Sequence, residues 1–110
     1  MQRWDLLELD APDGTRDPIV LYSDDGARAV LLVLTPGQAL GDHPVRENAW
    51  VLVLDGTVHF TAGDGPPLVA ESGTLTRFEA GERHSLTSPA GARVLLVLAP
   101  WPGEGHYPAD

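Results

Sequence analysis

Glycine and proline interrupt this chain so often that it has little room for helices. Ten Pro and twelve Gly are spread over 110 residues, and no stretch of ten residues carries a helical apolar stripe free of both. The runs between the breaks are short, and many are rich in Val and Leu, as is typical of β-strands. We expect strands at 5–9, 18–22, 28–35, 50–54, 57–61, 68–70, 74–78, 84–87 and 93–99. The sequence therefore predicts an all-β sandwich or barrel.

Two local patterns refine this expectation. Asp55-Gly56 stands between two strand-like runs and predicts a tight hairpin turn. Gly63-Asp64-Gly65-Pro66-Pro67 predicts a second, looser turn. The Val- and Leu-rich run at 30–36 is nearly repeated at 94–100, and continuous apolar runs of this kind are typical of buried strands. We interpret the two runs as two core strands.

Composition excludes several classes of partner and site. The formal charge is −9, and all seven basic residues are scattered Arg, so neither nucleic acid nor an anionic membrane surface is expected as a partner. Because the chain has no Cys, disulfides and Cys-built zinc or iron–sulfur sites are excluded.

The length fits one domain, spanning 1–110. Its first residues lack the basic-then-apolar layout of a signal peptide, and its longest apolar runs are too short to span a bilayer, so the expected location is cytoplasmic. We expect an N-terminal strand arm over 1–22, a motif region over about 27–100 and a C-terminal tail over 101–110.

Two glycine-bracketed segments each carry one histidine near a turn. The first spans 41–56 and contains His43, and the second spans 73–88 and contains His84. Sixteen residues separate Gly56 from Gly73. Their glycine spacing resembles that of a small single-domain cupin, and the resemblance implies a double-stranded β-helix, or jelly-roll barrel.

The first cupin motif runs Gly, five residues, His-x-His, three or four residues, Glu, six residues, Gly. Anchored on Gly56, its histidine positions fall on His43 and Val45, and its Glu position falls on Ala49. The second motif runs Gly, five residues, Pro-x-Gly, two residues, His, three residues, Asn. It matches at Gly73, Gly81 and His84, whereas Glu79 and Ser88 replace the Pro and the Asn.

A cupin metal site resembles three His and one Glu, and here the resemblance implies only half of that set. His43 and His84 are candidate ligands, but Val45 and Ala49 cannot bind a metal. Glu47, in the expected turn after His43, is a substitute ligand. His59 is expected to point away from the interior, because Val58 and Phe60 on either side have core character. His106, in the tail, is a third substitute. We therefore expect a divalent transition metal to be weakly bound or absent.

Three classes of function fit these features. The first is a barrel that binds a small molecule, in a pocket made by His43, Val45, Ala49, Val51 and His84. The second is an enzyme, either a metal-dependent dioxygenase or isomerase or a metal-free catalyst with His84 as general base. The third is an oligomeric interaction module. We favour the first, because Val45 and Ala49 make the pocket apolar.

A homodimer is a separate expectation. Small cupins often pair through an outer sheet face, and Trp4-Asp5-Leu6-Leu7-Glu8-Leu9 resembles the N-terminal strand that some of them exchange.

Overall fold

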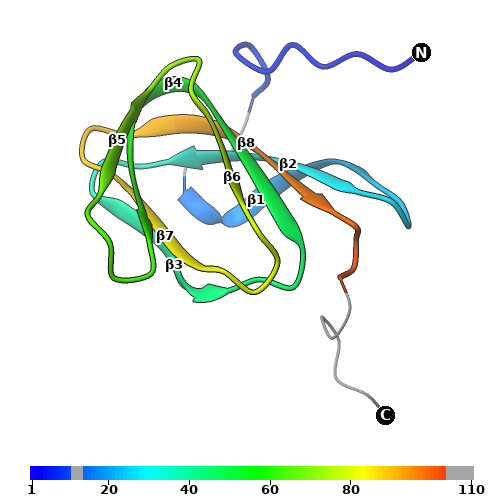
Figure 1. The fold of residues 1–110 in the computed structure, drawn as a ribbon. Helices are drawn as coiled ribbons and strands as arrows, with labels where there is room; N and C mark the ends of the chain where they lie inside the picture. Colours follow the sequence, from blue (N-terminus) through cyan, green and yellow to red (C-terminus); the bar gives the residue numbers. More distant parts are fainter. Residues whose placement is uncertain (11–13, 104–110) are drawn as a thin grey trace.

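In the part of the chain that the structure describes, eight antiparallel strands form a sheet that curls back on itself (Figure 1). The computed structural model describes residues 1–10 and 14–103, and the side chains of all these except 14–17 and 42–44. The strands are β1 (Gly14–Ser23), β2 (Arg28–Leu34), β3 (Gln38–Pro44), β4 (Asn48–Ala62), β5 (Leu68–Glu71), β6 (Leu75–Phe78), β7 (Arg83–Ser88) and β8 (Ala92–Ala99). The all-β prediction is confirmed. The described part of the chain has no helix long and apolar enough to cross a lipid bilayer.

The strand order along the sheet is β1-β2-β8-β4-β7-β3, and β5 and β6 both pair with β4. The two similar apolar runs are neighbours, because β2 pairs with β8 in a register that places Val30 opposite Leu96 and Leu32 opposite Val94. Val30, Leu32 and Val94 are buried in one core cluster. The interpretation of these runs as core strands is therefore confirmed.

The predicted hairpin at Asp55-Gly56 is wrong, because β4 continues through it. Gly56 has a φ of 88°, as a tight turn would need, but here it lies within one long strand, just after a register irregularity between Val53 and Asp55. The first half of β4 pairs with β8 and β6, and the second half pairs with β5 and β7. A hairpin would instead pair the two halves with each other. The looser turn at Gly63-Asp64-Gly65 is confirmed, and it connects β4 to β5.

Strand β3 was not predicted, because its sequence contains Gly41 and Pro44 and no Val-rich run. Its partner strand stabilises it: Ala39 lies opposite Thr87 and Leu40 opposite Leu86 on β7. Tertiary pairing thus overrides a weak local preference.

The predicted strand at 5–9 is also wrong, since these residues form a single turn. The N–H groups of Glu8 and Leu9 both donate to the Asp5 carbonyl, each at 2.9 Å. Arg93 on β8 donates through Nη1 to the carbonyls of Leu6 and Leu9, at 2.6 and 2.8 Å. These long-range bonds satisfy backbone acceptors that a strand would have to pair along a sheet edge. Within the described part of the expected N-terminal arm, residues 5–9 form a turn and the strand is β1, which begins at Gly14.

We predict that Gly56→Ala lowers the free energy of unfolding by about 2–4 kcal/mol. An added Cβ would overlap the Gly91 carbonyl oxygen and lie 2.9 Å from Ala92 Cα, in a backbone conformation that alanine rarely adopts. Urea unfolding measures the change. Gly73→Ala is the matched control, because Gly73 has a φ of 93° but nothing within 4 Å of an added Cβ. Equal losses in the two variants would show that close packing at Gly56 contributes nothing.

Candidate functional site

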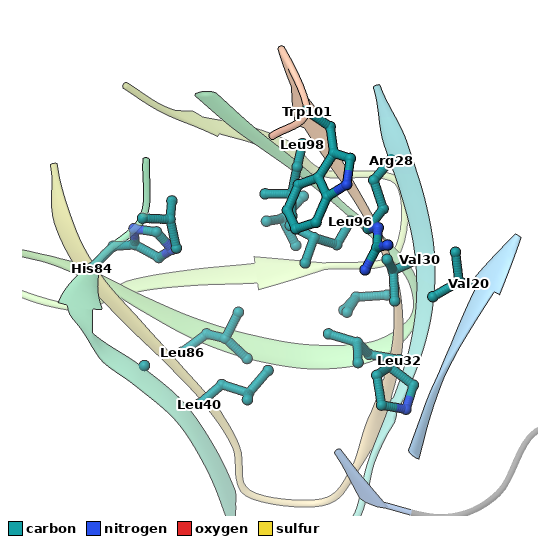
Figure 2. A pocket seen from close by; sticks show the side chains of 15 residues that line it. Val20, Arg28, Val30, Leu32, Leu40, His84, Leu86, Leu96, Leu98 and Trp101 are labelled. Atoms are coloured by element: carbon teal, nitrogen blue, oxygen red, sulfur yellow. The ribbon is translucent and has the colours of Figure 1, made fainter. Parts of the chain in front are cut away.

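A pocket of about 310 Å³ occupies the space inside the curled sheet (Figure 2). Strands β1, β2, β3, β4, β7 and β8 contribute to its wall, together with residues just after β3 and β8. Most of the lining side chains are aliphatic: Val20, Val30, Leu32, Leu40, Val45, Val51, Leu86, Val94, Leu96 and Leu98, with Pro18 beside them. The pocket therefore presents an apolar surface to a bound molecule, with a few polar groups at its margins.

His84 is one of these polar groups. It lies near the start of β7, after the turn at 79–82, and its ring is half-buried. The ring stacks on Phe78, with 4.2 Å between the ring centroids and 15° between the planes. Its Nδ1 lies 3.2 Å from the Glu82 carbonyl oxygen. Because a carbonyl only accepts hydrogen bonds, Nδ1 carries the proton in this contact, and Nε2 is the nitrogen left for other chemistry.

Arg28 is the second polar group, and it lies across the pocket from His84 (Figure 2). Its guanidinium carbon lies 4.1 Å from the centre of the Trp101 ring, within the range of a cation–π contact. Its Nε donates to Ser23 Oγ at 3.2 Å. The aromatic face and the hydroxyl together hold the guanidinium at the margin of the apolar lining.

The turn between β1 and β2 fixes where Arg28 begins its strand. Asp24 Oδ1 accepts hydrogen bonds from the N–H groups of Gly26 and Ala27, at 2.7 and 2.9 Å. These two donors, followed by the Tyr22 hydroxyl, lower the pKa of Asp24. The hydrogen bond to Asp24, and the charge of that carboxylate, raise the pKa of Tyr22. Asp24 thus organises the turn that precedes Arg28.

Glu47 connects the loop after β3 to the segment after β8. Its side chain is buried, and its Oε2 accepts a hydrogen bond from the Gly103 N–H at 2.7 Å. Gly103 is buried too, and a Cβ there would overlap the Arg46 carbonyl oxygen, so only glycine fits this approach. The contact fixes the chain two residues beyond Trp101 and so helps to hold that ring at the pocket.

The structure places the residues of the predicted pocket in three different settings. Val45, Val51 and His84 line the pocket. Ala49 is fully buried and packs in the core cluster. The backbone of His43 on β3 lies opposite that of His84 on β7. The side chain of His43 is not among those that the structure describes. A direct meeting of the two imidazoles stays a prediction.

Two other histidines were considered as substitute ligands. His59 lies between the buried Val58 and Phe60 on β4 and is itself only half-buried, so it faces away from the interior as predicted. His106 lies outside the described residues.

Sequence reasoning missed both Arg28 and Trp101 as pocket residues. A signal for Arg28 was present, because strand alternation places it on the same face as Val30 and Leu32. The position of Trp101 depends on the path of the chain after β8, which no local pattern predicts.

The described residues do not fit the metal site that the cupin resemblance implies. They contain no group of three or more His, Asp or Glu side chains that could hold an ion. Of the residues proposed as ligands, Glu47 instead accepts a hydrogen bond from Gly103, and His84 offers one nitrogen, Nε2. Catalytic metal sites typically use three protein ligands, so we derive no chemical step through a metal.

We predict that tag-free protein purified without added metal holds well below one equivalent of any transition metal. The physical reason is that the described residues around His84 provide too few ligands for a bound ion. Elemental analysis of the protein and of His84→Ala measures this. Near-stoichiometric metal that the variant loses would contradict the prediction, and it would show that residues outside the description complete the site.

Comparison with known proteins agrees with the curled antiparallel sheet described above. The family model for the cupin domain matches residues 30–98, more than half of the chain. None of the curated proteins compared with the chain matches it. The protein TT1209 from Thermus thermophilus has a similar structure, with a TM-score of 0.77 and 27% identity, over 91% of this chain and 98% of that one.

Two further solved structures are similar at lower identity. One is an uncharacterised Klebsiella pneumoniae protein with a double-stranded β-helix domain, with a TM-score of 0.78 and 19% identity over 94% of this chain and 93% of that one. The other is an RmlC-like cupin from Desulfovibrio desulfuricans, with a TM-score of 0.76 and 19% identity over 91% and 97%. These likenesses confirm the predicted jelly-roll class. The family match and the curled antiparallel sheet together show that this chain belongs to the cupin family.

Proposed function

We propose that this cupin binds a small, largely apolar organic molecule in its central pocket. The observation that carries the proposal is the lining itself, in which aliphatic side chains from six strands face a space of about 310 Å³. Ligand sites in proteins are typically concave and apolar, with a small number of polar groups that orient the ligand. Among the described residues of this lining, Arg28 and His84 are the ionisable ones. The cytoplasm remains the proposed location.

The apolar wall would drive binding by removing hydrocarbon from water, at about 25 cal/mol per Å² of apolar surface buried. Much of the wall already packs in the core: Val30, Leu32, Val51 and Val94 belong to the core cluster. A wall built from packed strands is rigid, so a ligand would lose little affinity in ordering it.

We predict that 1-hexanol binds the protein and that Leu96→Phe weakens this binding by about tenfold. The larger ring would fill pocket space next to Val30 and Val51, the cross-strand neighbours of Leu96. NMR titration measures the affinity. Leu95→Phe is the matched control, because Leu95 is the preceding residue on β8 and points to the opposite face of the sheet.

The two variants separate the possible results. Weaker binding in Leu96→Phe alone, with both variants folded, supports the pocket as the binding site. Equal affinities in the two variants, or no hexanol binding to the unmodified protein, would remove the pocket as a binding site.

A second candidate function, proton transfer to or from the bound molecule, is favoured by one contact. With Nδ1 directed to the Glu82 carbonyl, the neutral imidazole of His84 keeps a lone pair on Nε2, as a general base requires. Stacking on Phe78 holds the ring in place. The hexanol titration tests this as well, because His84 ring signals shift if the ring faces the bound molecule. Ring signals that stay fixed at saturation would exclude this role.

We also propose that the protein is a homodimer. Strand β1 lies at one end of the strand order, where its outer backbone edge offers a site for pairing. Val20 and Tyr22 on this strand are 46% and 44% exposed, which is high for large apolar side chains. An isologous pairing of two β1 edges would cover them.

We predict a two-fold assembly at micromolar concentration, measured by sedimentation velocity. Replacing Tyr22, which lies outside the pocket lining, by Lys should shift the protein toward monomer, because a charge would have to be desolvated in the interface. Leu68→Lys on β5 is the control, since Leu68 is also exposed but lies on another strand. A monomer in the unmodified protein would contradict the proposal.

A further inference from the structure

We propose that Arg28 is the head-group site of the pocket and that the molecule bound there is a small monocarboxylate with an apolar body. The inference rests on the proposed binding function and specifies its ligand class. The carboxylate would meet the guanidinium at the margin, and the hydrocarbon part would lie against the aliphatic wall toward His84 (Figure 2).

The first argument is the hydrogen-bonding state of Arg28. Within the described part of the chain, the guanidinium donates only through Nε, to Ser23 Oγ, and no ion pair engages it. Its Nη1–Nη2 edge therefore keeps its donors for another partner. A planar guanidinium edge of this kind matches the two oxygens of a carboxylate.

The second argument is that an acidic chain leaves this arginine without a counter-ion among its described residues. The formal charge is −9. Asp24, four residues away, directs its Oδ1 to the N–H groups of Gly26 and Ala27 instead. A half-buried cation beside an apolar wall is better stabilised by an anion than by the wall alone, so the pocket favours a ligand that brings one.

The third argument combines the contact of Arg28 with Trp101 and the number of cationic side chains in the pocket lining. Trp101 lies against the guanidinium, with 4.1 Å between the guanidinium carbon and the ring centre, and Ser23 Oγ accepts from Nε, so the group is held at the pocket margin with its Nη1–Nη2 edge left for hydrogen bonds. Among the described residues, the pocket lining contains one arginine, and the chain as a whole has no lysine. A single cation suits a monoanion, whereas a phosphate dianion would leave one charge uncompensated in acidic surroundings.

The test compares hexanoate with 1-hexanol, which has a chain of equal length and no charge. Isothermal titration calorimetry measures both affinities in the unmodified protein, in Arg28→Gln and in Arg28→Lys. We expect Arg28→Gln to weaken hexanoate binding by about tenfold or more and to change hexanol binding by less than about twofold. Arg28→Lys should give an intermediate result, since lysine keeps the charge but loses the planar fork.

Arg77→Gln is the matched control. Arg77 also lies over a tryptophan, with its guanidinium carbon 5.1 Å from the Trp50 ring centre, but it is exposed and outside this pocket. The Arg77→Gln variant should bind hexanoate and 1-hexanol with the same affinities as the unmodified protein. Thermal unfolding of each variant confirms that the fold is intact before affinities are compared.

The outcomes distinguish this inference from the proposed function. Hexanol binding without any preference for hexanoate would overturn the carboxylate site and leave the apolar pocket standing. Equal losses for both probes in Arg28→Gln would make Arg28 a structural residue. Binding of neither probe would overturn both proposals. Hexyl phosphate that binds more tightly than hexanoate would replace the monocarboxylate with a phosphate head group.

Discussion

Strand β4 is the element on which the rest of this barrel depends, because it pairs with four other strands. Its first half lies between β8 and β6, and its second half lies between β5 and β7. The change of partners takes place around Gly56, where the close approach of Gly91 and Ala92 leaves no room for a side chain. The strand thus joins the two parts of the sheet, and its inward residues Val51 and Val58 are almost fully buried. A pocket enclosed by strands from both parts exists because β4 bends without ending.

The binding properties of the pocket depend on the positions of its polar groups within an apolar wall. The aliphatic lining comes from strand interiors, whereas Arg28 begins β2 and His84 lies near the start of β7. Each of the two is held by an aromatic ring and one hydrogen bond: Arg28 by Trp101 and Ser23, His84 by Phe78 and Glu82. Side chains held in this way lose little conformational entropy when a ligand binds. The arrangement is suited to orienting a molecule that has a polar group and an apolar body.

The buried carboxylate of Glu47 has a positioning role. Burying a carboxylate is costly unless hydrogen bonds compensate, and the N–H of Gly103 supplies one of them. Because Glu47 precedes β4 and Gly103 follows β8, this bond ties together two segments far apart in the sequence. Trp101 lies between the end of β8 and that bond, so the margin of the pocket near Arg28 depends on it.

Local sequence determined the strand content, the core character of the two apolar runs and the outward orientation of His59, because alternation and turn residues act over a few positions. It also placed Val45, Val51 and His84 at the pocket, through the spacing of the cupin motifs. Tertiary structure alone decided that Asp55-Gly56 bends a strand and that 38–44 forms one, since both depend on partner strands distant in the sequence. It likewise decided that Arg28 meets Trp101, more than seventy residues away, because only the closing of the sheet brings the two side chains together.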